Sequence, residues 1–123
     1  MTALRWADID LAAISANCER IRAHVKGASV FAVVKADGYG HGAVPAANAA
    51  LEGGATGLAV ATLEEAAQLR GLIEAERVLV MGGLLPAQAR DAVASGCSIA
   101  VSGQEMAEAF QGTRQTVPVH LKI

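Results

Sequence analysis

The sequence predicts an α/β protein whose strands form one parallel sheet. Short apolar runs alternate with stretches of helical periodicity along the 123 residues, and the expected strand centres are Val33, Ala59, Leu79, Ala100 and Val119. The run around Ala59 is apolar without interruption, which is typical of a strand buried on both faces. Regular repetition of a strand and a helix favours parallel strands with right-handed crossovers. Two architectures fit, a doubly wound sheet and a barrel.

Composition excludes several classes of protein. Hydrophobic residues make up 53% of the chain and aromatic residues only 3%, so we expect one domain with an aliphatic core. The net charge of −2 offers no basic surface for nucleic acid. Cys18 and Cys97 do not form a disulfide framework, and their spacing to the histidines matches no metal site. With no signal sequence or membrane-length apolar run, we expect a cytoplasmic protein.

The first two expected helices have clear boundaries. Asp10 is a candidate N-cap for a helix that Gly27 ends. The next helix covers residues 42–51, where Pro45 is tolerated because it lies in the first turn. A glycine pair at 53–54 ends it.

Three further helices follow between later strands. Thr62 and Glu65 have the spacing of a capping box, for a helix expected to reach Ile73. Pro86 opens a helix over residues 86–94, which Gly96 ends. Ser102 is expected to cap the last helix, over residues 103–110.

The expected strands lie between these helices. The first begins at Phe31 and leads into Lys35, and the second is the apolar run around Ala59. The last three cover residues 78–81, 98–101 and 117–123. Pro118 places the last of these at a sheet edge, because proline cannot donate a ladder hydrogen bond.

Lys35 and the glycine-rich loop after it form the stretch that carries chemistry. Strand alternation places Val33 and Lys35 on one face, and a buried ammonium is costly unless it is paired, neutralised or in use. Three glycines at positions 38, 40 and 42 allow unusual backbone conformations close to a ligand. The alternative is a lysine whose head group reaches water beside an ordinary turn.

The order of residues here, Val-Lys-Ala-Asp-Gly-Tyr-Gly-His-Gly over positions 34–42, resembles the cofactor-attachment signature of alanine racemase. Weaker resemblance covers the rest of the chain, at residues 6–11, 57–62 and 117–122. It implies that Lys35 forms an aldimine with pyridoxal 5′-phosphate and that Tyr39 contacts the cofactor phosphate. It also implies an incomplete parallel (β/α) barrel, with residues 1–123 as the amino-terminal part. The rest of the barrel and a carboxy-terminal β-domain would be absent.

The resemblance further implies a function for the parent protein. Alanine racemases interconvert L-alanine and D-alanine, which supplies D-alanine for peptidoglycan, and they act as homodimers. Lys35 would be the catalytic base on one face of the substrate. The second base is implied to be a tyrosine from the partner subunit's carboxy-terminal domain, which this sequence does not contain. We therefore expect the isolated chain to be inactive.

Two other functions compete with this one. A fold-type III decarboxylase of basic amino acids also pairs a cofactor lysine with such a barrel, although the Tyr-Gly-His-Gly loop argues against it. From another class, the chain could be a non-catalytic half-barrel that serves as an assembly scaffold. Labelling of Lys35 by the cofactor would distinguish a scaffold from either enzyme.

The remaining polar residues have weaker claims to a role. His41 is a candidate for orienting the loop through a hydrogen bond, whereas His24 and His120 are expected to be structural. Glutamates 64 and 65 and Asp91 are assigned to helix starts and solvated faces. The segment 81–83 ends a strand at the level of Lys35 and could contact a ligand.

Overall fold

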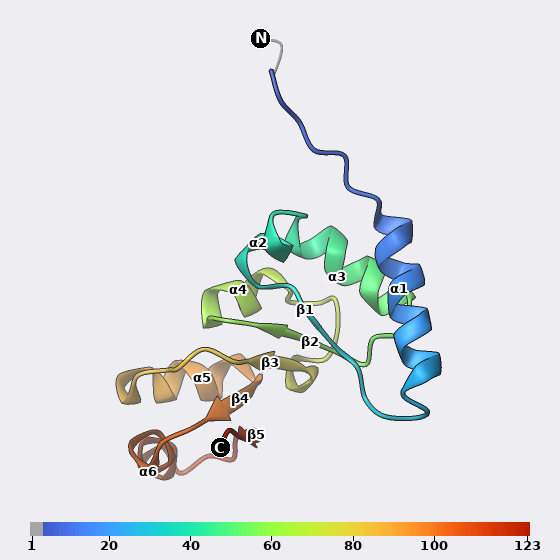
Figure 1. Cartoon of the computed structure of the whole chain (residues 1–123). Coiled ribbons are helices and arrows are strands. Elements are labelled where there is room, and N and C mark those ends of the chain that lie inside the picture. The colour runs from blue at the N-terminus through green and yellow to red at the C-terminus, as the bar shows by residue number, and fades with distance from the viewer. Residues whose placement is uncertain (1–3) are drawn as a thin grey trace.

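The computed structural model describes residues 4–123, in which five parallel strands form one sheet. The strands pair in the order in which they occur along the chain, from β1 to β5. Helices alternate with them (Figure 1). The strands are β1 (Phe31–Val33), β2 (Gly57–Val60), β3 (Val78–Val80), β4 (Ser98–Val101) and β5 (Val119–Leu121).

Six segments have α-helical hydrogen bonding, and two short 3₁₀ turns precede β3 and α5. The helices are α1 (Leu11–His24), α2 (Lys35–Tyr39), α3 (Ala43–Glu52), α4 (Leu63–Gln68), α5 (Ala89–Ser95) and α6 (Gln104–Thr113). The 3₁₀ turns are η1 (Ala75–Arg77) and η2 (Pro86–Gln88). Asp10 is the N-cap of α1 and accepts a hydrogen bond from the Ala13 N–H at 3.0 Å, as its position predicts.

The strand order decides between the two architectures that the sequence left open. A doubly wound sheet reverses its strand order at a switch point, whereas this sheet runs sequentially from β1 to β5. The sheet is also strongly curved, because Phe31 and His120 come from its two edge strands and yet their ring centroids lie 5.9 Å apart. The predicted partial (β/α) barrel is therefore confirmed.

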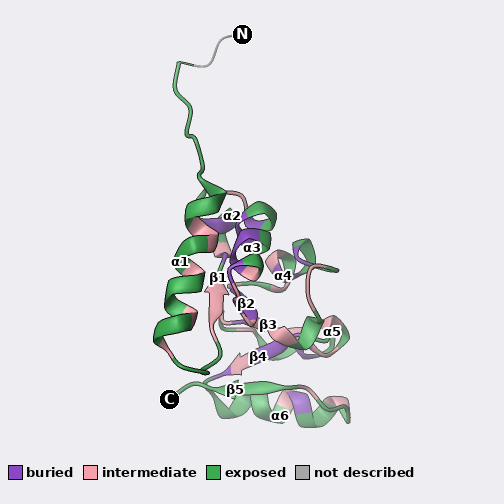
Figure 2. Cartoon of the chain, turned by 90° about the vertical axis from the view of Figure 1, so that its right-hand side faces the viewer, coloured by how far each residue is buried: buried purple, intermediate pink, exposed green. Residues whose placement is uncertain are grey.

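The core lies between the sheet and the helices outside it. Alternate strand positions such as Leu58, Val80 and Ile99 are completely buried, together with one alanine-rich face of α3 (Figure 2). The intervening positions face the open inner side of the curved sheet, where Val33 is 38% exposed. The prediction that β2 is buried along its whole length is correct.

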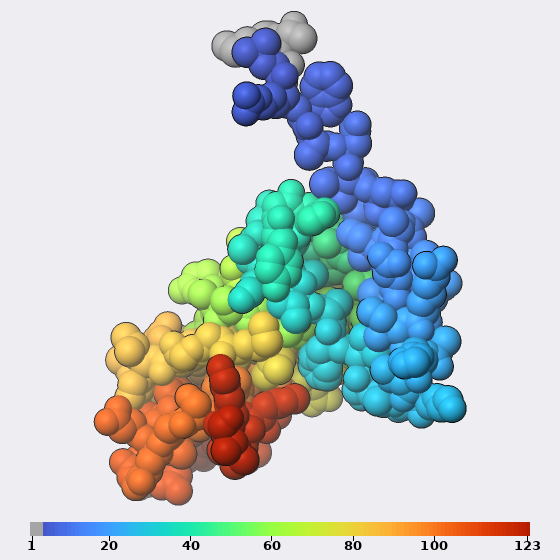
Figure 3. All heavy atoms as spheres, viewed as in Figure 1, coloured from blue at the N-terminus to red at the C-terminus, as the bar shows by residue number. Residues whose placement is uncertain are grey.

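The amino-terminal segment before α1 leaves the body of the molecule. Residues 4–10 form no helix or strand, and they extend away from the sheet (Figure 3). Trp6 on this segment is 78% exposed.

Several predicted boundaries are wrong, each for a local reason. Helix α4 ends at Gln68 and not at Ile73, because Leu69 is buried in the core and Gly71 turns the chain at a φ of 86°. The N-cap of α6 is Gly103 without a side-chain bond, so Ser102 does not cap it. Helix α1 ends at His24, before Gly27.

Candidate functional site

Lys35 lies just beyond the carboxyl end of β1. The sequence predicts a strand that continues into Lys35, but the observed strand ends two residues earlier, at Val33. The Val34 N–H still donates to the Ala59 carbonyl at 2.9 Å, so the ladder to β2 holds the chain up to this point. Lys35 is half-buried, and its ammonium forms no ion pair within the described part of the chain. The carboxyl ends of barrel strands are where active sites of this fold collect.

The backbone after Lys35 makes a left-handed turn. Residues 36–39 have φ values of 50°, 54°, 62° and 57°, and Gly40 follows at 86°. Three of these residues, Ala36, Asp37 and Tyr39, have a side chain, and each left-handed L-residue costs about 1–2 kcal/mol. Such strain persists only where surrounding contacts impose it, and it is concentrated at functional sites.

Close packing on α3 favours glycine at position 38 of this turn. Gly38 is buried at a φ of 62°, and a Cβ there would lie 3.3 Å from the Ala46 Cβ. The turn therefore packs directly on α3 with no room for a side chain.

Two side chains within the loop hold its shape. Asp37 Oδ1 accepts a hydrogen bond from the Ala43 N–H at 2.8 Å and so caps the first turn of α3. His41 Nδ1 lies 2.8 Å from the Gly38 carbonyl oxygen. The predicted hydrogen bond of His41 to the loop is therefore present, and its orienting role stays a prediction.

A third support comes from α4. Glu65 accepts hydrogen bonds from the Ala36 N–H at 2.8 Å and from the Ala61 N–H at 2.7 Å, one on each carboxylate oxygen. It thereby joins the segment after β1 to the segment after β2. These hydrogen bonds lower the pKa of Glu65 below its ordinary value of 4.5, and the nearby charge of Lys35 lowers it further.

A shallow pocket lies beside the loop. It has a volume of about 210 Å³ and lies between α1, β1 and α3, with Val33, Tyr39 and His41 in its wall. Tyr39 is 59% exposed, so its hydroxyl is accessible. The structure brings Tyr39 and His41 together in this pocket, and Lys35 directly follows two of its lining residues, Val33 and Val34, without lining it itself.

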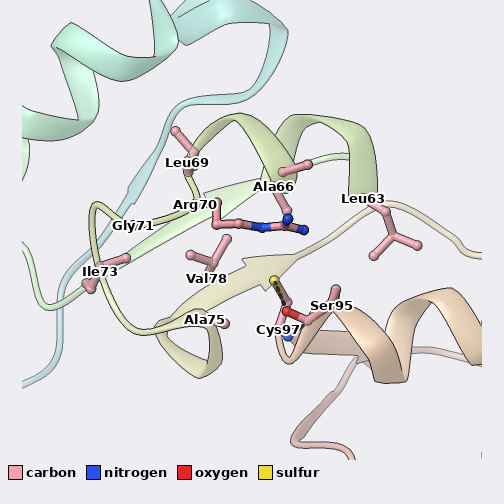
Figure 4. Close-up of a pocket in the computed structure, with 11 residues that line it drawn as sticks. Leu63, Ala66, Leu69, Arg70, Gly71, Ile73, Ala75, Val78, Ser95 and Cys97 are labelled. Atoms are coloured by element: carbon pink, nitrogen blue, oxygen red, sulfur yellow. Dashed lines mark hydrogen bonds between the residues drawn. The ribbon is translucent and has the colours of Figure 1, made fainter.

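A second pocket has no connection with Lys35. It is lined by α4, by the segment from α4 to the first residue of β3, Val78, and by Cys97 just before β4, and the Arg70 side chain extends across it (Figure 4). Its volume is about 230 Å³. The two cysteines are free, and burial raises the pKa of the Cys18 thiol.

The strand-end segment 81–83 does lie near the site. The Met81 N–H donates to the Val60 carbonyl at 2.8 Å and the Gly82 N–H to the Ala61 carbonyl at 3.0 Å. It is thereby fixed to the same peptide region that Glu65 binds. A Cβ on Gly82 would lie 2.1 Å from the Ala61 oxygen, so this close approach requires glycine.

Two supporting residues of the site are not evident from the sequence. Glu65 has the position of a helix start, and Asp37 stands in the motif without a predicted role, yet both hold the loop. Thr62 does accept from the Glu65 N–H at 3.1 Å, as a capping box predicts, but the carboxylate binds Ala36 and Ala61. The available indication was a glutamate in the first turn of the helix that follows β2, because β2 is the next strand along the chain after the lysine strand.

Comparison with known proteins gives a consistent family. The family model "Alanine racemase, N-terminal domain" matches residues 9–123. Alanine racemase of Desulforamulus reducens is 44% identical over 123 residues, which cover 96% of this chain and 33% of that protein. The crystal structure of alanine racemase from Bartonella henselae, with covalently bound pyridoxal phosphate, has a TM-score of 0.83 and 28% identity and covers 94% of this chain.

Another solved structure agrees. Alanine racemase from Streptomyces coelicolor has a TM-score of 0.81 at 38% identity, over 94% of this chain and 32% of that one. The chain thus spans about a third of the length of the relatives it matches. Within the described residues, no helix is long and apolar enough to cross a membrane. The model of the N-terminal domain matches this chain from residue 9 to residue 123, and the fold is shared with solved alanine racemases, so the chain belongs to the alanine racemase family.

Proposed function

We propose that this chain is the cofactor-binding part of a pyridoxal phosphate-dependent racemase that interconverts L-alanine and D-alanine. The observation that carries this proposal is the position of Lys35. Its ammonium, which has no ion pair among residues 4–123, follows the carboxyl end of β1 and precedes a strained loop held by three side chains. The family match supplies the chemistry to which this arrangement is suited.

The residues present fit pyridoxal 5′-phosphate. An amine without an ion pair is free to bond covalently to an aldehyde, and the exposed Tyr39 hydroxyl can donate to a phosphate oxygen. When bound, the cofactor withdraws electron density from the α-carbon of an amino acid and makes its proton acidic. The relative from Bartonella henselae holds this cofactor covalently.

The chain's own residues have distinct tasks in this proposal. Lys35 holds the cofactor and, once its amine is released by substrate, moves a proton at the alanine α-carbon. Tyr39 binds the phosphate, and His41 orients the loop between them. The resemblance to alanine racemases implies that the opposite face is served by a tyrosine of the partner subunit in a homodimer.

The cofactor assignment is tested by reductive trapping. The 123-residue chain is mixed with a limiting amount of pyridoxal 5′-phosphate, reduced with borohydride and mapped by peptide mass spectrometry. The chain has three lysines, so Lys26 and Lys122, both exposed, are internal controls. We expect the label mainly at Lys35, with Lys35→Ala leaving only the background of the other two.

The phosphate role of Tyr39 is tested in the same assay. Tyr39→Phe removes only the hydroxyl, and loss of one hydrogen bond to a charged group should weaken cofactor binding about tenfold. Equal labelling of all three lysines would contradict the proposal. Racemase turnover of the chain alone at the rate of a full-length relative would contradict the expected inactivity.

A further inference from the structure

We propose that Glu65 is a positioning residue that fixes the left-handed turn carrying Lys35 and Tyr39 to the end of β2. The inference deepens the proposed function and rests on it for its consequence at Lys35. The Glu65 carboxylate accepts hydrogen bonds from backbone N–H groups on two different segments. The Ala36 N–H belongs to the peptide group that directly follows Lys35, and the Ala61 N–H lies just past β2.

Both hydrogen bonds are short and charge-assisted. Their lengths of 2.8 and 2.7 Å lie in the range of bonds to an ionised acceptor. Ala36 and Glu65 are 29 residues apart in sequence, so the bond is a tertiary contact. Each oxygen has its own donor, and the two segments are therefore tied together by a single side chain.

Helix capping alone does not account for this geometry. The Thr62 hydroxyl already accepts from the Glu65 N–H at 3.1 Å, which satisfies one free amide of the first turn of α4. In a simple capping box the glutamate side chain returns to the N-cap backbone. Here the carboxylate interacts more weakly with the Thr62 backbone than with Ala36 and Ala61, and it extends past the helix to the segment after β1, where α4 itself gains nothing from the bond with Ala36.

The bond acts where the backbone is strained. Ala36 is the first residue of the left-handed turn, at a φ of 50° and a ψ of 50°. Without the carboxylate its N–H would lose its partner, and the residue could return to a negative φ at lower energy. That rotation would change the direction of the chain on both sides of the peptide, and Lys35 lies on one side of it.

The local arrangement is tested first without cofactor, by amide NMR of the 123-residue chain. We expect the Ala36 and Ala61 amide shifts to move together on acid titration, with one midpoint below 4.5, the ordinary pKa of glutamate. Glu65→Gln should abolish this titration, and the coupling constants of Ala36 should lose their left-handed values. Amides that titrate separately, or an Ala36 unchanged in Glu65→Gln, would overturn the inference.

The consequence for Lys35 is tested by borohydride trapping with pyridoxal 5′-phosphate. We expect Glu65→Gln to reduce labelling of Lys35 about tenfold at limiting cofactor, the effect of one charged hydrogen bond. Two control variants should label as the unaltered chain does. Thr62→Ala removes the helix cap and leaves the carboxylate, and Glu64→Gln removes an equal charge from the same helix.

The variant Glu65→Asp distinguishes the effect of the negative charge from the effect of side-chain length. It keeps the negative charge but is one methylene shorter, so it cannot span both amides, and we expect reduced labelling. Full labelling in Glu65→Asp, or an equal loss in Thr62→Ala, would overturn the positioning role. If the unaltered chain does not label at Lys35, the proposed function fails, and the amide titration alone then confirms or overturns the role of Glu65 in the turn.

Discussion

The two ends of the sheet are held in different ways. At the carboxyl ends, the segment after Lys35 has a left-handed backbone and is held by charged side chains, Asp37 and Glu65. At the amino ends, the residues that make the contacts lie outside the left-handed region, and neutral or cationic donors bind carbonyl groups. The Ser98 hydroxyl donates to the Glu76 carbonyl at 2.6 Å, and the Arg77 Nε donates to the Thr56 carbonyl at 2.6 Å.

The contacts at the amino ends of the sheet therefore stabilise the fold, whereas those at the carboxyl ends shape the proposed site. Contacts at the amino ends join unstrained elements, so their net effect is to stabilise the fold. Contacts at the carboxyl ends impose a conformation that the chain would not adopt alone. The same division occurs in barrels generally, where one face carries chemistry and the other carries stability.

The largest expected effect comes from the buried glycine of the strained turn. Gly38→Ala adds a Cβ 3.3 Å from the Ala46 Cβ at a left-handed φ, so we expect the free energy of unfolding to fall by about 2–4 kcal/mol in a urea titration. Gly40→Ala is the matched control, because its φ is 86° but its Cβ position is open. It should cost about 1–2 kcal/mol. Equal losses in the two variants would mean that packing on α3 is unimportant.

The amino-end contacts should affect stability without affecting the lysine. Ser98→Ala leaves the Glu76 carbonyl without its buried donor and should cost about 1–2 kcal/mol by urea unfolding. Labelling of Lys35 by pyridoxal phosphate under folding conditions should be unchanged. Ser102→Ala is the control, since Ser102 is exposed and does not cap α6, and its stability should stay within about 0.5 kcal/mol. A labelling defect in Ser98→Ala would contradict the division between the two ends.

The Asp37 cap should depend on its oxygen and not on its charge. Asp37→Ala removes the acceptor for the Ala43 N–H, and we expect the free energy of unfolding to fall by about 1 kcal/mol. Asp37→Asn keeps an acceptor and tolerates a left-handed φ, so its stability should be close to that of the unaltered chain. A large loss in Asp37→Asn would instead indicate a role for the charge.

The smallest expected effect is a pH dependence at Glu65. Its pKa is lowered in the folded state, so the carboxylate stabilises the fold fully above about pH 4.5, and this contribution is lost as pH falls through the folded pKa. Glu65→Gln should therefore show a flatter decline of stability with acid, by urea titration at a series of pH values. Because Glu65 is partly exposed, water screens the effect. Identical pH profiles for the two proteins would contradict it.

Local patterns predicted most of the elements but not their ends. The Asp10 cap and the buried run of β2 were correct because they depend on nearby residues alone. The end of α4 was wrong because burial of Leu69 and the turn at Gly71 outweigh helical periodicity. The extent of β1 was wrong because the backbone leaves the extended conformation at Val34, which has a ψ of 24°, just before the left-handed turn that begins at Ala36.

The supporting residues of the site could not be deduced in the same way. Lys35, Tyr39 and His41 lie in one stretch of nine residues, and their order alone indicated the family. Glu65 reaches that stretch only because β1 and β2 are neighbours in the sheet, which places the starts of α2 and α4 together.

By itself, the sequence determined the α/β class, the alternation of strands and helices, and the lysine-containing motif, because each depends on residues close together in the chain. The tertiary structure decided the sequential strand order, the curvature that brings Phe31 to His120, and the left-handed turn held by Glu65. Those features depend on contacts between distant segments. The free energy of such contacts can overcome local backbone preference, as it does at Ala36.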